Sequence, residues 1–197
     1  RTLGNVPGSY RGVSGSYGGL GKIGDPSYPA PDTYGDFRNP DDVGSGGGGR
    51  VGYGTGGNGG GLVKIKASIV SLFGSIMAAG GDSTGWGGGS GGGIWIEADT
   101  LEGTGTISAS GGSGWHGGGG GRVAVYYDDI SGFDPMNITA FGGSADDDRS
   151  GGAGTVFLNS SAQAYGELIV DNNGLNGSET PLRSVGSGII TDLTATV

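Results

Sequence analysis

The sequence contains no cysteine, only one histidine and no long apolar run. Without cysteine the chain can form neither a disulfide framework nor a thiolate metal site. Any Ser/His/Asp triad would depend on His116, and a catalytic zinc site with a single histidine is disfavoured. No segment approaches the roughly 20 apolar residues that a membrane-spanning helix needs. These absences argue against an enzyme and against a membrane span.

Basic residues are also scarce. Ten of them stand against 19 acidic residues, which gives a formal net charge of −9. Nucleic acids and anionic membranes attract clustered lysine and arginine, so neither is an expected partner. The chain begins at Arg1 without a methionine or a signal peptide, and we expect it to be a mature or excised part of something longer.

Glycine, by contrast, supplies 52 of the 197 residues. Collagen is excluded because glycine does not recur at every third position and only 7 prolines are present. Disorder fits poorly, because 33% of the residues are hydrophobic and they come in short alternating runs. The composition therefore predicts an unusual but folded chain.

A repeat of 31 residues accounts for those runs. One column of the repeat is Ile76, Ile107, Ile138 and Ile169. Two more columns, upstream in each unit, are Val63, Ile94, Val125, Val156 and Ile65, Ile96, Tyr127, Leu158. Each unit contains two alternating, strand-like segments, such as LVKIKA and SIMAA, followed by a glycine-rich loop.

Such a repeat predicts stacked coils that bury their apolar faces against one another. We expect an all-β fold, a parallel β-solenoid with four full coils of about 31 residues and glycine-rich loops. The units are placed near 58–88, 89–119, 120–150 and 151–181, with a partial unit over 182–197 that begins near Ile189. Residues 1–57 do not repeat and are expected to form an irregular Gly/Pro/Tyr-rich cap that covers or wraps the first coil.

Two other arrangements stay open. One is a glycine-rich β-sandwich, whose two sheets come from the two strand types. In the other, the glycine loops pack as polyproline-II-like helices. An open solenoid end would expose strand edges, so we expect self-association or contact with neighbouring domains of a larger chain.

The pattern GGxGGGxIxIxA, GTISAxGG and GGGGGRVAVYY resembles repeats of large secreted or surface proteins of bacteria, similar to β-helical adhesins and extracellular matrix components. The pieces GSYGGLG and DVGSGGGG resemble the segment that precedes such repeats. The resemblance implies an extracellular or cell-surface, non-catalytic role and supplies no catalytic residues. Glycine-rich tips of phage tail fibres are a more distant likeness, through the glycine loops alone.

Aromatic residues form two candidate contact surfaces. One outward column of the first strands reads Lys64, Trp95, Tyr126 and Phe157, which would stack as an aromatic ladder suited to sugar rings or a protein partner. The alternative is that the N-terminal segment, or a second sheet, covers this column.

The loops after the second strands form the other candidate surface. They place Trp86, Trp115 and His116 on one edge with acidic residues and Arg149, a mixture of side chains that suits carbohydrate binding. There the alternative is that both tryptophans shield glycine backbone.

Three weaker features complete the candidates. The triplet Asp146, Asp147 and Asp148 could hold Ca²⁺, although it lacks the ligand spacing of a calcium loop. Asn-x-Ser/Thr triplets make possible glycosylation sites of Asn137, Asn159 and Asn176. Asp128 and Asp129 suggest the carboxylate pair of a polysaccharide hydrolase, but neighbouring strand residues point in different directions.

We therefore predict a non-catalytic, extracellular structural or adhesive module without a required cofactor, one that could assemble end to end into a fibre. The alternatives are a carbohydrate-binding module, such as part of a host-recognition fibre, and, less favoured, a polysaccharide-degrading enzyme.

Overall fold

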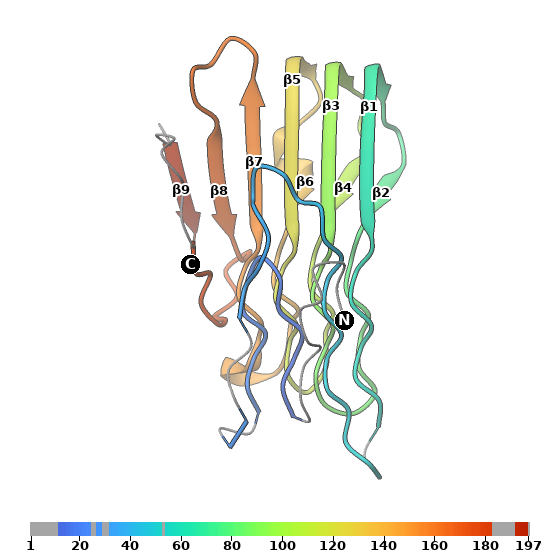
Figure 1. Cartoon of the computed structure of the whole chain (residues 1–197), viewed down its shortest axis with the longest axis vertical. Coiled ribbons are helices and arrows are strands. Elements are labelled where there is room, and N and C mark those ends of the chain that lie inside the picture. The colour runs from blue at the N-terminus through green and yellow to red at the C-terminus, as the bar shows by residue number, and fades with distance from the viewer. Residues whose placement is uncertain (1–11, 25–26, 29–31, 53, 183–191, 197) are drawn as a thin grey trace.

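The computed structural model describes residues 12–24, 27–28, 32–52, 54–182 and 192–196. Its strands gather in one half of an elongated molecule, and glycine-rich segments without regular secondary structure fill the other half (Figure 1). The described residues form β-strands and two 3₁₀ turns, η1 (Pro135–Asn137) and η2 (Asp147–Arg149), and no α-helix. None of the described segments is a helix long and apolar enough to cross a bilayer.

Two sheets form the walls of the solenoid. The larger has the order β1-β3-β5-β7-β8-β9, and the smaller has the order β2-β4-β6. The strands of the larger sheet are β1 (Leu62–Ser71), β3 (Gly93–Glu102), β5 (Arg122–Gly132), β7 (Thr155–Ser160), β8 (Glu167–Asp171) and β9 (Asp192–Thr196). Those of the smaller sheet are β2 (Ser75–Met77), β4 (Thr106–Ser108) and β6 (Ile138–Thr139). Strands β1, β3, β5 and β7 are parallel to one another, as are all three of the smaller sheet. The predicted parallel β-solenoid is confirmed, with about three turns and a spacing of about 31 residues.

The core lies between the two sheets. Ile94, Ile96, Ile107, Val123 and Val125 have no exposed surface at all. They come from alternating positions because successive strand residues point to opposite faces. The burial of each such side chain contributes about 1.5–3 kcal/mol to the stability of the folded chain. The smaller sheet pairs Ile76 with Ile107 and Ile107 with Ile138, which confirms the isoleucine ladder of the sequence analysis as far as the third turn.

The register of the larger sheet departs from a constant repeat. Gly93 pairs with Arg122, 29 residues later, and Arg122 pairs with Thr155, 33 residues later. The glycine loop before β5 is two residues short, and a bulge beside β5 and the turn η1 take up two extra residues after it. The two shifts cancel, so the smaller sheet keeps its spacing of 31.

This shift makes the predicted first-strand columns wrong in the third turn. Val123, and not Val125, continues the column of Ile94. Val125 lies beside Ile96 and Leu158, the place expected for Tyr127. The mistake follows from assuming that every unit has the same length, which the chain satisfies only on average.

The fourth coil does not form as expected. Strand β8 turns back and pairs antiparallel with β7, so that Ile169 lies beside Val156 in the larger sheet. The reversal occurs in a tight turn in which Ser160 accepts a hydrogen bond from the backbone of Gln163. Unit 151–181 is therefore not a full solenoid turn, and Ile169 does not extend the isoleucine ladder. The unit start expected near Ile189 lies outside the described residues.

The glycine-rich half is held together by its main chain. Gly88 and Gly91 donate hydrogen bonds to the carbonyls of His116 and Gly119, three residues apart on both sides. Gly117 and Gly120 repeat this pattern with the carbonyls of Arg149 and Gly152. A three-residue period is also that of polyproline II helices, and packing of the glycine loops as such helices stays a prediction.

The described part of residues 1–57 is irregular, with isolated bridges only. It runs among the glycine loops of several turns and does not sit over the first coil alone (Figure 1). The Gly15 N–H donates to the carbonyl of Gly88, and the Gly15 carbonyl accepts from the N–H of Gly119. The Leu20 N–H donates to the carbonyl of Glu179, which follows β8 in the chain. This segment ties the glycine loops of successive turns together.

Candidate functional site

A stack of two tryptophans lies at the tips of the glycine loops. The rings of Trp86 and Trp115 are nearly parallel, with 14° between their planes and 5.7 Å between their centroids. The backbone sets this arrangement, because His116 donates its N–H to the carbonyl of Trp86 at 2.9 Å. The two neighbouring loops are thus held side by side, which brings their two indole rings within stacking distance.

Two arginines extend the stack. The Arg50 guanidinium carbon lies 5.0 Å from the centroid of Trp86, and that of Arg149 lies 5.7 Å from the centroid of Trp115. Cation–π contacts of this kind contribute about 0.5–1 kcal/mol at exposed sites and more where water is excluded. Trp115 remains 56% exposed, whereas Trp86 is half-buried between its neighbours. Trp115 is therefore the ring that an outside molecule meets.

His116 lies beneath this surface. Its side chain is buried, and its ring stacks on Trp86 with centroids 5.5 Å apart. Burial, together with the positive charges of Arg149 and Lys22, lowers the pKa of His116. The structure thus gives His116 the position of a neutral supporting ring and not that of an exposed contact.

A shallow hollow of about 390 Å³ adjoins the exposed indole. Its lining is Ser83, Thr84, Gly85, Gly114, Trp115, Asp146 and Arg149. The hollow offers hydroxyls, a carboxylate and a guanidinium beside an aromatic face. Such a combination provides both stacking and hydrogen bonding, which binding sites for polar ring-shaped ligands require.

The predicted aromatic ladder on the solenoid wall is wrong in its register. Trp95 pairs with Ala124, and Tyr126 lies two positions further along, beside Glu97. The rings still meet diagonally, with centroid distances of 6.2 Å from Trp95 to Tyr126 and 5.9 Å from Tyr126 to Phe157.

Residues of the N-terminal segment cover this aromatic column. Phe37 packs edge-on against Phe157 at 5.4 Å, and Phe157 is buried. The Tyr126 hydroxyl donates a 2.8 Å hydrogen bond to the carbonyl of Arg38. Within the described residues, the alternative considered for this column therefore applies, because the rings serve to attach the N-terminal segment.

The acidic triplet lies at η2. Asp146 precedes this turn and is exposed, and Asp148 accepts a hydrogen bond from Asn176 at 3.2 Å. Across the residues that the structure describes, no three acidic or histidine side chains gather closely enough to hold a metal ion. Calcium binding at this triplet stays a prediction.

The three asparagines of the glycosylation triplets differ in accessibility. Asn176 is exposed at a loop tip, whereas Asn137, directly before β6, and Asn159, within β7, are half-buried. Asn176 is the one of the three that a glycan could occupy without disturbing the sheets. Asp128 and Asp129 are both exposed on β5, and Asp129 accepts a hydrogen bond from Ser131, which lowers its pKa.

Sequence reasoning did not identify Arg50, Phe37 or Arg38 as parts of these surfaces. All three belong to the non-repeating segment, where no period links them to the tryptophans or to Phe157. No family model, no curated protein and no solved structure matches this chain.

Proposed function

We propose that this chain is a non-catalytic, extracellular adhesive module that contacts carbohydrate with the tips of its glycine loops. One observation carries the proposal: the indole of Trp115, which is 56% exposed and stacks on Trp86, borders a hollow that Asp146 and Arg149 also line. Sugar rings present apolar faces to aromatic side chains and hydroxyls to charged groups. The solenoid, in this proposal, is the rigid support that holds the loop tips.

The proposal separates the two tryptophans by role. Trp115 contacts the ligand, while Trp86 lies half-buried between Trp115, His116 and Arg50 and holds the contact ring in place. Because Trp115 is exposed, its replacement removes a contact surface without opening the core. Trp115→Ala is therefore the informative substitution.

The test is binding of the purified chain to a panel of immobilised bacterial and plant polysaccharides, followed by Trp115→Ala. We expect at least a tenfold loss of affinity, since truncation of a dominant contact tryptophan costs about 2 kcal/mol or more. Tyr165→Ala is the matched control, because Tyr165 is also an exposed aromatic residue but lies in the turn between β7 and β8. Binding that is equal in wild type and Trp115→Ala, or absent from the whole panel, would contradict the proposal.

End-to-end assembly is the second candidate, and the free face of the first turn favours it. Ile69, Phe73 and Met77 are 64%, 75% and 63% exposed there, next to the outer edges of β1 and β2. Exposed apolar side chains beside a strand edge promote association. Light scattering and electron microscopy distinguish the cases: filaments that disappear in Phe73→Asp support assembly, and a monomer at all concentrations contradicts it.

A further inference from the structure

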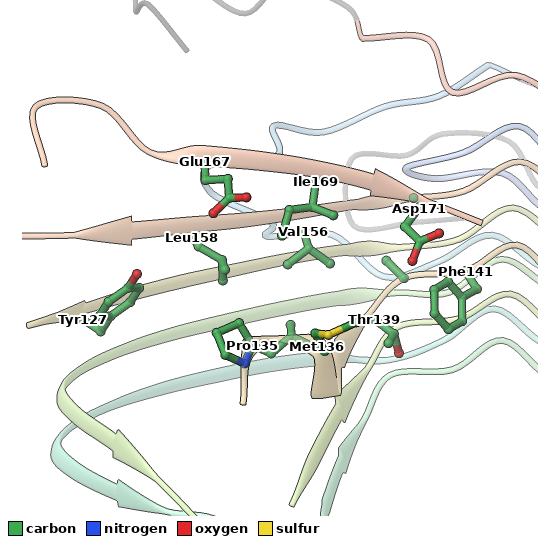
Figure 2. Close-up of a pocket in the computed structure, with 13 residues that line it drawn as sticks. Tyr127, Pro135, Met136, Thr139, Phe141, Val156, Leu158, Glu167, Ile169 and Asp171 are labelled. Atoms are coloured by element: carbon green, nitrogen blue, oxygen red, sulfur yellow. The ribbon is translucent and has the colours of Figure 1, made fainter. Parts of the chain in front are cut away.

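A groove of about 370 Å³ opens between the two sheets at the end of the third turn (Figure 2). Val156 and Leu158 of β7 and Ile169 of β8 form one wall, and Met136 and Thr139 lie on the other side. Ile138 of β6 also lines the groove. Met136 is 85% exposed at its rim. The groove is therefore an apolar continuation of the solenoid core.

The groove exists because the two sheets end at different places. The larger sheet continues past β7 with β8 and β9, whereas β6 is the last strand of the smaller sheet among the described residues. In the preceding turns a three-residue strand with a central isoleucine, Ile76 or Ile107, fills the equivalent space. The groove thus lies where the next strand of the smaller sheet would stand, beside Ile138.

Strand β8 adds charge to this groove. Glu167, Ile169 and Asp171 occupy alternate positions and point to the groove side, as Figure 2 shows, while Leu168 between them is buried against the opposite face. The two carboxylates lie four strand residues apart, which corresponds to about 13 Å. An acidic group thus stands near each end of an apolar centre.

A second copy of the chain does not fit the groove as a further coil. Its β2 could pair with β6 only if its β1 lay beside β7, because a short turn joins β1 to β2. That position is already taken by β8. The net charge of −9 on each copy also opposes insertion of this chain between two carboxylates.

We propose that this groove binds a single extended segment of another protein, which adds to β6 as the next strand of the smaller sheet. Strand addition to an exposed sheet edge supplies main-chain hydrogen bonds, and pockets for alternate side chains supply specificity. The segment carries an aliphatic residue that continues the isoleucine ladder beyond Ile138. A lysine or arginine two positions before and two positions after it meets Glu167 and Asp171, because residues two apart on a strand share a face.

The test uses the full chain and three labelled synthetic peptides. The probe is Gly-Lys-Ser-Ile-Ser-Lys-Gly; a second peptide has glutamate in place of both lysines, and a third has serine in place of isoleucine. We expect fluorescence anisotropy to detect binding of the first peptide alone. Hydrogen exchange of the complex should show new protection at residues 138–141.

The double variant E167Q/D171N should weaken binding about tenfold, because it removes both partly exposed ion pairs with the peptide. The double variant D99N/E179Q changes the net charge equally at exposed sites outside the groove and should leave binding unchanged. Equal binding of the lysine and glutamate peptides, no binding of any peptide, or protection that excludes β6 overturns the proposal. A dimer that forms without peptide and is lost in E167Q/D171N assigns the groove to a second copy and also overturns it.

Discussion

The Nε atom of Arg122 donates a 2.9 Å hydrogen bond to the carbonyl oxygen of Tyr34, 88 residues earlier in the chain. Arg122 opens β5 and is only 4% exposed, and its guanidinium also lies 3.3 Å from the Thr155 hydroxyl and 5.5 Å from the centroid of the Tyr17 ring. A buried guanidinium thus joins the solenoid to the N-terminal segment. Burial lowers the pKa of Arg122.

Replacing Arg122 with methionine should therefore destabilise the chain. The substitution keeps much of the aliphatic stem but leaves the Tyr34 carbonyl without its donor, and an unsatisfied buried polar group costs about 1–3 kcal/mol. Urea unfolding followed by tyrosine and tryptophan fluorescence measures the change. Arg38→Met, at a half-buried arginine, is the control and should cost less; equal losses in the two variants would contradict the role given to Arg122.

Ile107→Ala should be among the most damaging core substitutions. Ile107 has no exposed surface and lies between Ile76 and Ile138 in the smaller sheet, so its truncation leaves a cavity and costs about 2–5 kcal/mol. Ile76→Ala, in the half-buried first turn, should cost distinctly less. Denaturation midpoints of the two variants, measured in the same buffer, test this. A loss of stability in Ile76→Ala equal to or larger than that in Ile107→Ala would contradict the prediction.

Glycines in the loops should differ sharply in their tolerance of alanine. A Cβ at Gly118 would overlap the carbonyl of Gly89, whereas a Cβ at Gly61 meets no atom within 4 Å. Gly118→Ala should destabilise by about 1–3 kcal/mol through forced backbone shifts. Gly61→Ala should be neutral or stabilising by up to about 1 kcal/mol, because it reduces the freedom of the unfolded chain. Thermal unfolding of both variants tests this contrast, and a similar loss in both would refute it.

Stability should fall on mild acidification because of His116. Its pKa is lowered in the folded state by burial and by Arg149 and Lys22, whereas an unfolded histidine titrates near pH 6.5. Below that pH the unfolded chain binds a proton that the folded chain resists, so this contribution to stability is present above about pH 6.5 and is lost as the pH falls.

The measurement is the change in Tm between pH 7.5 and pH 5 for the wild type and for His116→Gln. We expect a smaller change in the variant, whatever its Tm at pH 7.5. Identical changes would mean that His116 is not responsible for the pH dependence.

Much of the fold could be predicted from the spacing of Ile76, Ile107 and Ile138, because a buried ladder demands the same residue type in each turn. The displacement of Val125 and Tyr126 could not be predicted, because the two residues missing from one loop are restored by one extra residue in the bulge of β5 and one more before β6, which leaves the overall period unchanged. The reversal at β8 was hidden for a similar reason: Ile169 keeps its place in the sequence column although the strand runs the other way.

At the candidate site, the pairing of the Trp86 and Trp115 loops followed from the repeat, and the structure brings the two rings together. The contacts of Arg50 and Phe37 did not follow from it. They depend on how a non-repeating segment crosses the glycine loops, and a sequence period contains no information on that path.

The glycine half of the molecule has a consequence for how the chain can change over evolutionary time. Many of its hydrogen bonds join backbone to backbone, and many of its side-chain positions carry only a hydrogen atom. A layer of glycine backbone therefore separates the loop tips that carry Trp86, Trp115 and Arg149 from the isoleucine core. A change of side chain at the tips does not alter the packing of that core. Insertions and substitutions at the tips can diversify the outer surface while the same scaffold is inherited unaltered.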